Sequence, residues 1–208
     1  DGWDFYSSEH LTVTQRPVLT ISFTSPQSPS IDLDANNSSG ATGSDYQTVF
    51  TEGLGPVNVT DVLDAAITDV DSATLQSVTV TLTNVLDGAD ELLTVDTSGT
   101  SITASTMTGP GTTTLTLSGV EPRADYESVL RTVQYDNTSD DPNTTVRTIE
   151  FVVTDQVGLT SNTATSSVTV ARTNDDPTGS GSLTATSLND NDGATNLFGG
   201  LTVTDVDT

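Results

Sequence analysis

The chain has 208 residues, enough for one or two domains, and sets 29 acidic residues against five basic ones, for a net charge of −24. This charge makes nucleic acid and anionic membrane surfaces poor partners. The chain has no cysteine, so disulfides and thiolate metal sites are excluded, and its one histidine supplies neither a catalytic triad nor a zinc centre well. No apolar run approaches the roughly 20 residues of a membrane span. We therefore expect no enzyme and no membrane insertion.

The acidic residues are mostly aspartate, 23 against six glutamates, and threonine occurs 41 times. Aspartate favours turns over helices, and threonine suits pleated, half-exposed surfaces, so the composition favours an all-β protein rich in loops. Like charge at this density destabilises a compact state unless cations offset it. Bound divalent ions and adaptation to a salty medium explain the bulk charge equally well. The positions of the acidic residues must decide between these two explanations.

Residues 1–24 hold most of the aromatic side chains and two alternating segments, at 11–14 and 18–23, that predict strands. Two strands are marginally stable alone, so we expect them to be the C-terminal strands of a preceding β-domain. The segment 2–9, followed by Arg16 and Pro17, resembles the C-terminal end of DNRLRE-type β-sandwich modules of secreted microbial proteins. Residues 25–45 are rich in Ser, Pro, Asn, Gly and Asp and predict a linker or loop.

From residue 46 to about 171, apolar and polar residues alternate in segments such as 77–83, 114–117, 148–153 and 167–171. Turn signals at 87–88, 109–111 and 157–158 separate them, which predicts a Greek-key antiparallel β-sandwich of seven or eight strands within residues 46–177. One segment has helical spacing, with Tyr126, Val129, Leu130 and Val133 following Asp125. This predicts a short helix near 125–131 with Asp125 as its N-cap.

The tetrapeptide Thr-Asp-Val-Asp occurs at 68–71 and again at 204–207. The second copy closes a segment, 178–208, that is too short to fold alone and that we expect to begin the next module of the same kind. On this interpretation the sequence is an excerpt from a longer array: the tail of one domain, a complete domain and the start of another.

Several carboxylates stand where a hard cation could be bound. Calcium takes six to eight oxygen ligands, and two carboxylates on alternate residues can bind one ion where the backbone turns at a strand end. Asp69 and Asp71 fit this arrangement, and Asp155 follows an apolar strand at what we expect to be the same end. Glu52 opens the main sandwich. The linker contributes a further set: Asn174, Asp175 and Asp176, ahead of Pro177.

This order of acidic elements resembles the cadherin-like, Ig-like β-sandwich repeats of large bacterial surface and secreted adhesins. In cadherins each calcium cluster draws on one domain, the linker and the next domain, so the resemblance implies two clusters here. The C-terminal cluster would comprise Glu52, Asn174, Asp175, Asp176, Asp205 and Asp207. The N-terminal cluster would comprise Asp69, Asp71 and Asp155, with linker acids such as Asp32 and Asp34. The mid-domain Asp-Arg-Glu element of cadherins has no match, and Asp90-Glu91 is the candidate substitute.

These observations predict a calcium-binding, calcium-stiffened tandem extender or adhesion module of a large extracellular or cell-surface protein. Its partners would be the neighbouring modules of the same chain, with self-association or surface and matrix ligands as further options. Two alternatives stay open. One is a structural subunit of an extracellular filament or sheath that assembles by strand addition, and the other is a carbohydrate-binding or hydrolytic module.

Overall fold

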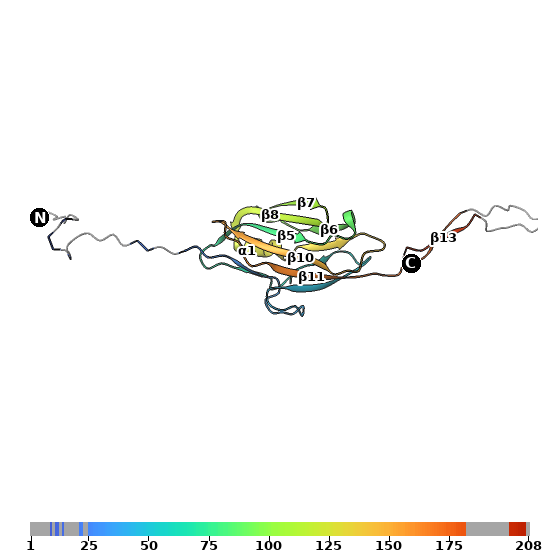
Figure 1. Ribbon diagram of the computed structural model, residues 1–208, viewed down its shortest axis with the longest axis horizontal. Coiled ribbons are helices and arrows are strands. Elements are labelled where there is room, and N and C mark those ends of the chain that lie inside the picture. The colour runs from blue at the N-terminus through green and yellow to red at the C-terminus, as the bar shows by residue number, and fades with distance from the viewer. Residues whose placement is uncertain are drawn as a thin grey trace, which may run out of the picture.

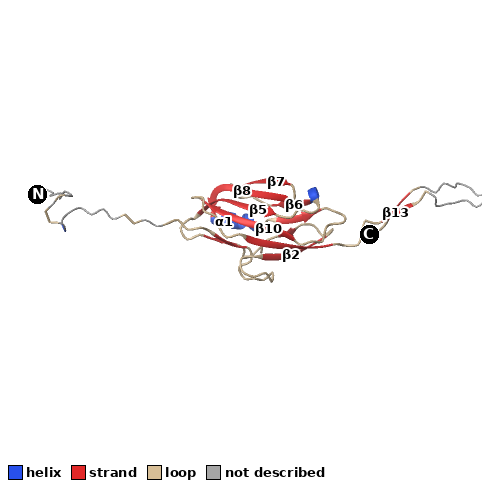
Figure 2. Ribbon diagram, in the orientation of Figure 1, coloured by secondary structure: helices blue, strands red, loops and turns tan. Residues whose placement is uncertain are grey.

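A computed structural model describes residues 25–181 and 200–206 continuously, together with residues 9, 11–12, 14 and 21–22. The main body is a β-sandwich, as the alternating pattern predicted (Figures 1 and 2). Its larger sheet has six strands. In spatial order they are β2 (Tyr46–Thr51), β11 (Ala164–Ala171), β10 (Arg147–Asp155), β5 (Thr74–Leu82), β8 (Thr112–Pro122) and β7 (Thr103–Gly109).

Shorter elements pack against this sheet. They are the three-stranded sheet β3 (Val57–Asn58), β9 (Gln134–Asn137) and β6 (Glu91–Thr94), the pair β1 (Ser30–Asp32) and β4 (Ala66–Thr68), the short 3-10 turn η2 (Gly88–Asp90) and the helix α1 (Arg123–Leu130). The ring of Phe50 on β2 meets that of Tyr135 on β9 edge to face, with 5.5 Å between centroids. This contact joins the two layers directly.

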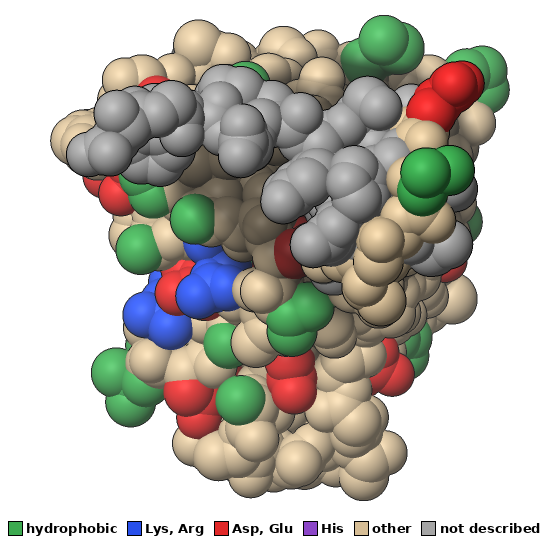
Figure 3. All heavy atoms as spheres, turned by 90° about the vertical axis from the view of Figure 1, so that its left-hand side faces the viewer, with side chains coloured by type: hydrophobic (Ala, Val, Ile, Leu, Met, Phe, Trp, Pro, Cys, Tyr) green, Lys and Arg blue, Asp and Glu red, His purple; other side chains and the backbone are tan. Residues whose placement is uncertain are grey.

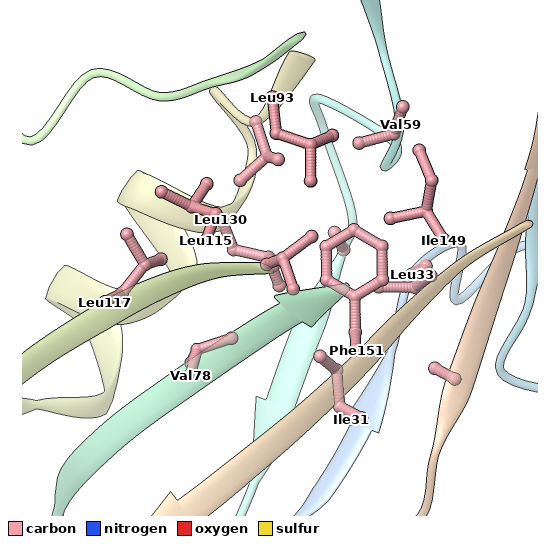
Figure 4. Close-up of a cluster of buried hydrophobic side chains, with 14 of the residues drawn as sticks. Ile31, Leu33, Val59, Val78, Leu93, Leu115, Leu117, Leu130, Ile149 and Phe151 are labelled. Carbon is pink, nitrogen blue, oxygen red and sulfur yellow. The ribbon is translucent and has the colours of Figure 1, made fainter. Parts of the chain in front are cut away.

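The core follows from the period-two pattern of the long strands. On β5 the side chains of Val78, Val80 and Leu82 are fully buried, while the residues between them are half-exposed. Figure 4 shows Val78 and Phe151 facing Leu93 and Leu130 across the interior. Fully burying each such side chain contributes about 1.5–3 kcal/mol, so the alternation supplies both the fold class and much of its stability.

Three features differ from the sequence prediction. The packed body begins at β1, inside the predicted linker 25–45, because Ile31 and Leu33 are fully buried and β1 pairs with β4. The edge strand β2 lies parallel to β11, not antiparallel. The helix starts at Arg123 with Pro122 as N-cap, so Asp125 lies in its first turn, where a negative charge favours the helix dipole.

The turn signals behave as predicted. Gly111, with φ of 72°, closes the hairpin between β7 and β8, and Gly158, with φ of 90°, closes the turn after β10. A left-handed backbone at both points favours glycine. Two further strands lie beyond the sandwich, β12 (Thr178–Ser180) and β13 (Thr202–Thr204), which pair with each other. Within the described residues, no helix is long and apolar enough to cross a membrane.

The chain enters the sandwich at one end and leaves it at the other (Figure 1). The end of the sandwich that carries the start of β1, the start of β5 and the end of β10 is called the proximal end. The distal end carries the ends of β2 and β11, which run in parallel. Because β10 is antiparallel to both β11 and β5, Asp155 lies at the proximal end, far from Glu52.

Candidate cation sites at the two ends of the sandwich

At the distal end, Glu52 is a buried and half-satisfied carboxylate. It follows the last residue of β2, and its amide donates to the carbonyl of Ala171 at 3.0 Å. Only 6% of the residue is exposed. Oε2 accepts the amide of Thr173 at 2.9 Å, whereas Oε1 is buried and has no hydrogen-bond partner among the described residues. An unsatisfied buried polar atom costs about 1–3 kcal/mol and more when charged. A hydrogen-bond donor or a cation in contact with this oxygen would therefore stabilise the folded state.

Glu52 lines a cavity of about 330 Å³ together with three other acidic side chains, Asp136, Asp140 and Asp175. Asp136 lies at the end of β9 and Asp140 in the loop that follows. Asp175 belongs to the segment that leaves β11. No basic residue lines the cavity. Acidic residues of three separate chain segments therefore line one cavity, and carboxylate oxygens are the donors that a hard divalent cation prefers. The tight three-carboxylate cluster found among the described residues lies elsewhere.

The loop after β9 and the departing chain are clamped side by side. The guanidinium of Arg172 pairs with Asp141 at 2.6 Å and donates to the carbonyl of Pro142 at 2.6 Å. The next residue, Thr173, donates to Glu52. These contacts fix the first residues of the linker against the body of the sandwich, while Asp175 lines the cavity beside them.

The remaining predicted distal residues lie further along the linker. The side-chain amide of Asn174 donates to the carbonyl of Asp175 at 2.9 Å. Asp175 and Asp176 line a second cavity, of about 290 Å³, with Thr204 and Val206 of the strand pair beyond. Asp205 is exposed, and Asp207 lies outside the described residues. The prediction of Glu52 and Asp175 in one site thus has a geometric counterpart, whereas the Asp205–Asp207 pair stays a prediction.

At the proximal end, Asp69 and Asp71 form a turn ahead of β5. Oδ1 of Asp69 accepts the amides of Asp71 at 3.1 Å and Ser72 at 2.9 Å, while its Oδ2 is buried and finds no hydrogen-bond partner in the described part of the chain. Burial raises the pKa of Asp69, but these amides and the nearby Arg123 outweigh it and leave the pKa below its ordinary value. Asp71 accepts the amide of Gln27 at 3.0 Å, which ties the arriving chain to this turn.

Asp155 repeats the half-satisfied state of Glu52. It is fully buried, its Oδ1 accepts the amides of Val157 at 2.9 Å and Leu159 at 2.8 Å, and its Oδ2 has no hydrogen-bond partner among the described residues. The structure does not place Asp69, Asp71 and Asp155 in one tight trio, since the three-carboxylate cluster found in the described residues lies elsewhere. Figure 3 looks onto this end, where arginine side chains adjoin acidic ones.

That cluster comprises Asp34, Asp61 and Asp64, each with a carboxylate oxygen within 4.8 Å of the others. Burial disfavours the charge on Asp34, but hydrogen bonds from Ser39 and Ser38 outweigh it and lower its pKa. Burial raises the pKa of Asp64, and the neighbouring charges of Asp61 and Asp34 raise it further. Sequence reasoning included Asp34 but missed Asp61 and Asp64. The sequence feature that could have indicated them is the spacing Asp-x-x-Asp just ahead of β4. This strand pairs with β1, which directly precedes Asp34 in the chain.

The candidate substitute Asp90-Glu91 does not form a cation site. Glu91 is buried and accepts hydrogen bonds from Arg147, in a direct ion pair, and from the Tyr135 hydroxyl at 2.7 Å. Arg147, itself fully buried, also pairs with Asp87 at 2.6 Å. The expectation for Glu91 was wrong because its partner arginine lies 56 residues further along the chain and the pair forms only in the folded state.

The strand pair beyond the linker repeats the pair that opens the sandwich. In β1 and β4, Ser30 pairs with Thr68, and Asp69-Val70-Asp71 follows. In β12 and β13, Thr178 pairs with Thr204, and Asp205-Val206-Asp207 follows in the sequence. A proline directly precedes the first strand in both, Pro29 and Pro177. Both copies of the tetrapeptide thus close an antiparallel strand pair of the same register.

No family model matches this chain, and no curated protein sequence matches it. Among solved structures, the chain is similar to a cohesin module from a family 33 glycoside hydrolase of Clostridium perfringens ATCC13124, with a TM-score of 0.38 and 9% identity. The similarity covers 72% of this chain and all of that module. It is too low to indicate a shared family.

Proposed function

We propose that this chain contains a calcium-binding, calcium-stiffened module of a tandem array in a large extracellular protein, where it acts in surface or matrix adhesion. The observation that carries the proposal is the buried carboxylate of Glu52. One of its oxygens accepts a hydrogen bond from Thr173 of the departing chain, and the other has no partner among the described residues. The repeated strand pair supports a tandem arrangement. The half-satisfied Asp155 supports a second cation site at the opposite end.

The mechanism follows from charge. Without a divalent cation, the carboxylates of Asp136, Asp140 and Asp175 repel one another and Glu52, which favours movement of the linker away from the sandwich. A bound calcium ion replaces this repulsion by coordination and holds the linker in one orientation. Extracellular modules of this kind bind calcium at about 10⁻⁴–10⁻³ M, so the array would be stiff in calcium-rich fluids and flexible elsewhere.

Small-angle scattering and thermal melting, each in EDTA and in calcium, test the proposal. We expect calcium to raise the melting temperature and to narrow the distribution of chain dimensions. Sodium chloride at matched ionic strength serves as the control, because general screening should produce only part of either effect. Identical melting temperatures and scattering curves in EDTA and calcium would refute the proposed function.

A second candidate, assembly by strand addition, is favoured by β7. This strand lies at the edge of the six-stranded sheet, and the side chains of its residues are largely exposed, including Met107 at 76%. An uncovered edge strand can pair with another chain. Sedimentation of the chain over a range of concentrations distinguishes the two, since fibres that grow with concentration support assembly and a single monomeric species supports the extender module.

A further inference from the structure

The strand β7 is an edge of the six-stranded sheet that no other described segment covers. It pairs with β8 on one side only, and Figure 1 shows it as the outermost strand of that sheet. Six of its seven residues are exposed. They include Ala104, Thr106 and Thr108, although their partners on β8 are buried. The inner layer therefore ends at β8, and β7 exposes both of its faces as well as its outer edge.

The opposite edge of the same sheet, β2, is occupied. The amide of Gln47 donates to the hydroxyl of Ser39 at 3.3 Å, and the side-chain amide of Gln47 donates to the carbonyl of Ser39 at 2.8 Å. The loop that carries Ser39 thus lies against β2. Edge strands are usually protected from other chains by such a cover, by charge, by proline or by a bulge. β7 contains no charged residue and no proline, and its pairing with β8 has no bulge.

The free edge also lies in the longest uncharged stretch of the chain. No charged side chain occurs in residues 97–120, which hold β7 and most of β8, although charged residues make up 16% of the chain and its net charge is −24. Two copies of so acidic a protein repel each other where their acidic surfaces meet. A cationic partner would be drawn to the acidic ends of the sandwich instead. The β7 edge therefore suits a second copy of this chain, which meets no opposing charge on either strand.

A second copy fits this edge in one register. When two sheets continue into each other about a two-fold axis, their equivalent faces lie on the same side, so opposed residues must differ by an even number of positions. Full overlap of the seven residues of β7 then places Thr106 opposite its own copy. Ala104 lies opposite Thr108, and Ser105 lies opposite Met107. Such a pair is closed, because it uses the free edge of both copies.

We propose that β7 is a homotypic docking edge, through which two copies of this chain pair antiparallel and join their six-stranded sheets into one. This inference goes beyond the proposed function, since the contact needs no calcium. A single strand pair is weak, because isolated pairs are marginally stable. In a tandem array the contact recurs along two neighbouring chains, and multivalency strengthens it. Only this last step rests on the proposed function, and it gives β7 the role of joining arrays side by side.

Cysteine cross-linking tests the register. The chain has no cysteine, so Thr106→Cys and Thr108→Cys each carry a single thiol at an exposed position. In the proposed pair, the two Cα atoms at Thr106 lie about 4.5–5.5 Å apart, which suits a disulfide. The two Thr108 positions lie about 14 Å apart along the strands, which excludes one.

The oxidant is oxidised glutathione, in EDTA. We expect Thr106→Cys to form the disulfide dimer at least about tenfold faster than Thr108→Cys. Mixing Thr108→Cys with Ala104→Cys should restore fast cross-linking, because these two positions oppose each other in the proposed register. Unchanged melting temperatures verify that the three variants fold.

Sedimentation equilibrium of the full 208-residue chain measures the non-covalent contact. We expect dimers of the unaltered chain at a concentration of about 1 mM, in EDTA and about 0.5 M sodium chloride, which screens the general repulsion. Thr106→Asp places two like charges opposite each other and should weaken the dimer by about fivefold or more. Thr169→Asp adds the same charge at an exposed position of β11 and, as the matched control, should weaken it by less than about twofold.

Three results overturn the proposal. Equal cross-linking rates for Thr106→Cys and Thr108→Cys would make random collision the cause. An unaltered chain that stays monomeric at about 1 mM has no such contact. Fibres in place of dimers would show open-ended assembly and not a closed pair. Because every measurement is made in EDTA, failure here leaves the calcium proposal standing, and melting that is unaffected by calcium leaves the strand pairing standing.

Discussion

Glu52→Gln should raise the stability of the protein in the absence of calcium and should lose that advantage, in whole or in part, in its presence. The amide oxygen of glutamine can keep the hydrogen bond from Thr173, while its NH₂ group takes the place of the unpartnered oxygen. Removing an unsatisfied buried charge should then stabilise the metal-free protein by about 1–3 kcal/mol. At about 2–4 °C per kcal/mol for a domain of this size, the melting temperature in EDTA should rise by about 2–12 °C.

In calcium this advantage should shrink, because the unaltered protein gains the binding free energy of the ion. One site with Kd of about 10⁻⁴–10⁻³ M stabilises the native state by about 1.4–2.7 kcal/mol at about 10 mM calcium. Glu52→Gln should lose most of this gain. Differential scanning calorimetry in EDTA and in calcium measures both effects, and Glu150→Gln, at an exposed position within β10, is the control for simple loss of charge. A Glu52→Gln variant that is less stable by the same amount under both conditions would refute the reasoning, because Glu52 would then be a purely structural group.

Two further predictions concern groups away from the distal cavity. Arg147→Met leaves the buried Glu91 and the half-buried Asp87 without their cation, so it should lower the free energy of unfolding by about 3–5 kcal/mol, measured by urea unfolding; a loss below about 1 kcal/mol contradicts this. Asp34 has a lowered pKa in the folded state, so it contributes stability above its ordinary pKa near 4, and this contribution is lost as the pH falls through the folded value. Asp34→Asn should therefore cost about 1 kcal/mol at neutral pH, and this cost should fall as the pH is lowered below about 4, measured by urea midpoints in EDTA; a pH-independent cost is inconsistent with it.

The sequence predicted those parts of the fold that local periodicity encodes. The long strands β5, β8, β10 and β11 each alternate over four or more residues, and the turns between them carry glycine where the backbone is left-handed. The helix was found from its buried stripe of Tyr126, Val129 and Leu130. β1 escaped detection, because a strand of three residues within a polar segment has too little periodicity to register, although its Ile31 is fully buried.

The candidate sites were predictable only in part, since their members are distant in sequence. Glu52 and Asp175 were found from their order along the chain, and the structure places both on one cavity. Asp136, within β9, and Asp140, in the loop after it, were missed because aspartates near strand ends are typical turn residues. Only the pairing of β9 with β3 and β6 brings their loop to the end of β2. The position of this loop therefore depends on how the three strands pair with one another, which no local stretch of sequence encodes.

The four arginines in the described part of the chain all bind groups within the protein. Arg123 donates to the carbonyl of Asp69, and Arg131 donates to that of Ala65. Arg147 pairs with Glu91 and Asp87, and Arg172 pairs with Asp141. Five basic residues cannot balance 29 acidic ones, so most of the remaining counter-charge must come from solution.

Monovalent salt and divalent cations should supply that counter-charge in different ways. Salt at physiological strength screens charges beyond about 8 Å, which relieves diffuse repulsion over the surface. Screening cannot satisfy a buried carboxylate oxygen, because that oxygen needs a ligand in direct contact. The unpartnered oxygens of Glu52 and Asp155 are therefore the groups through which a bound calcium ion should raise the stability further once screening by salt is complete. Stability should level off with sodium chloride and rise again when calcium is added.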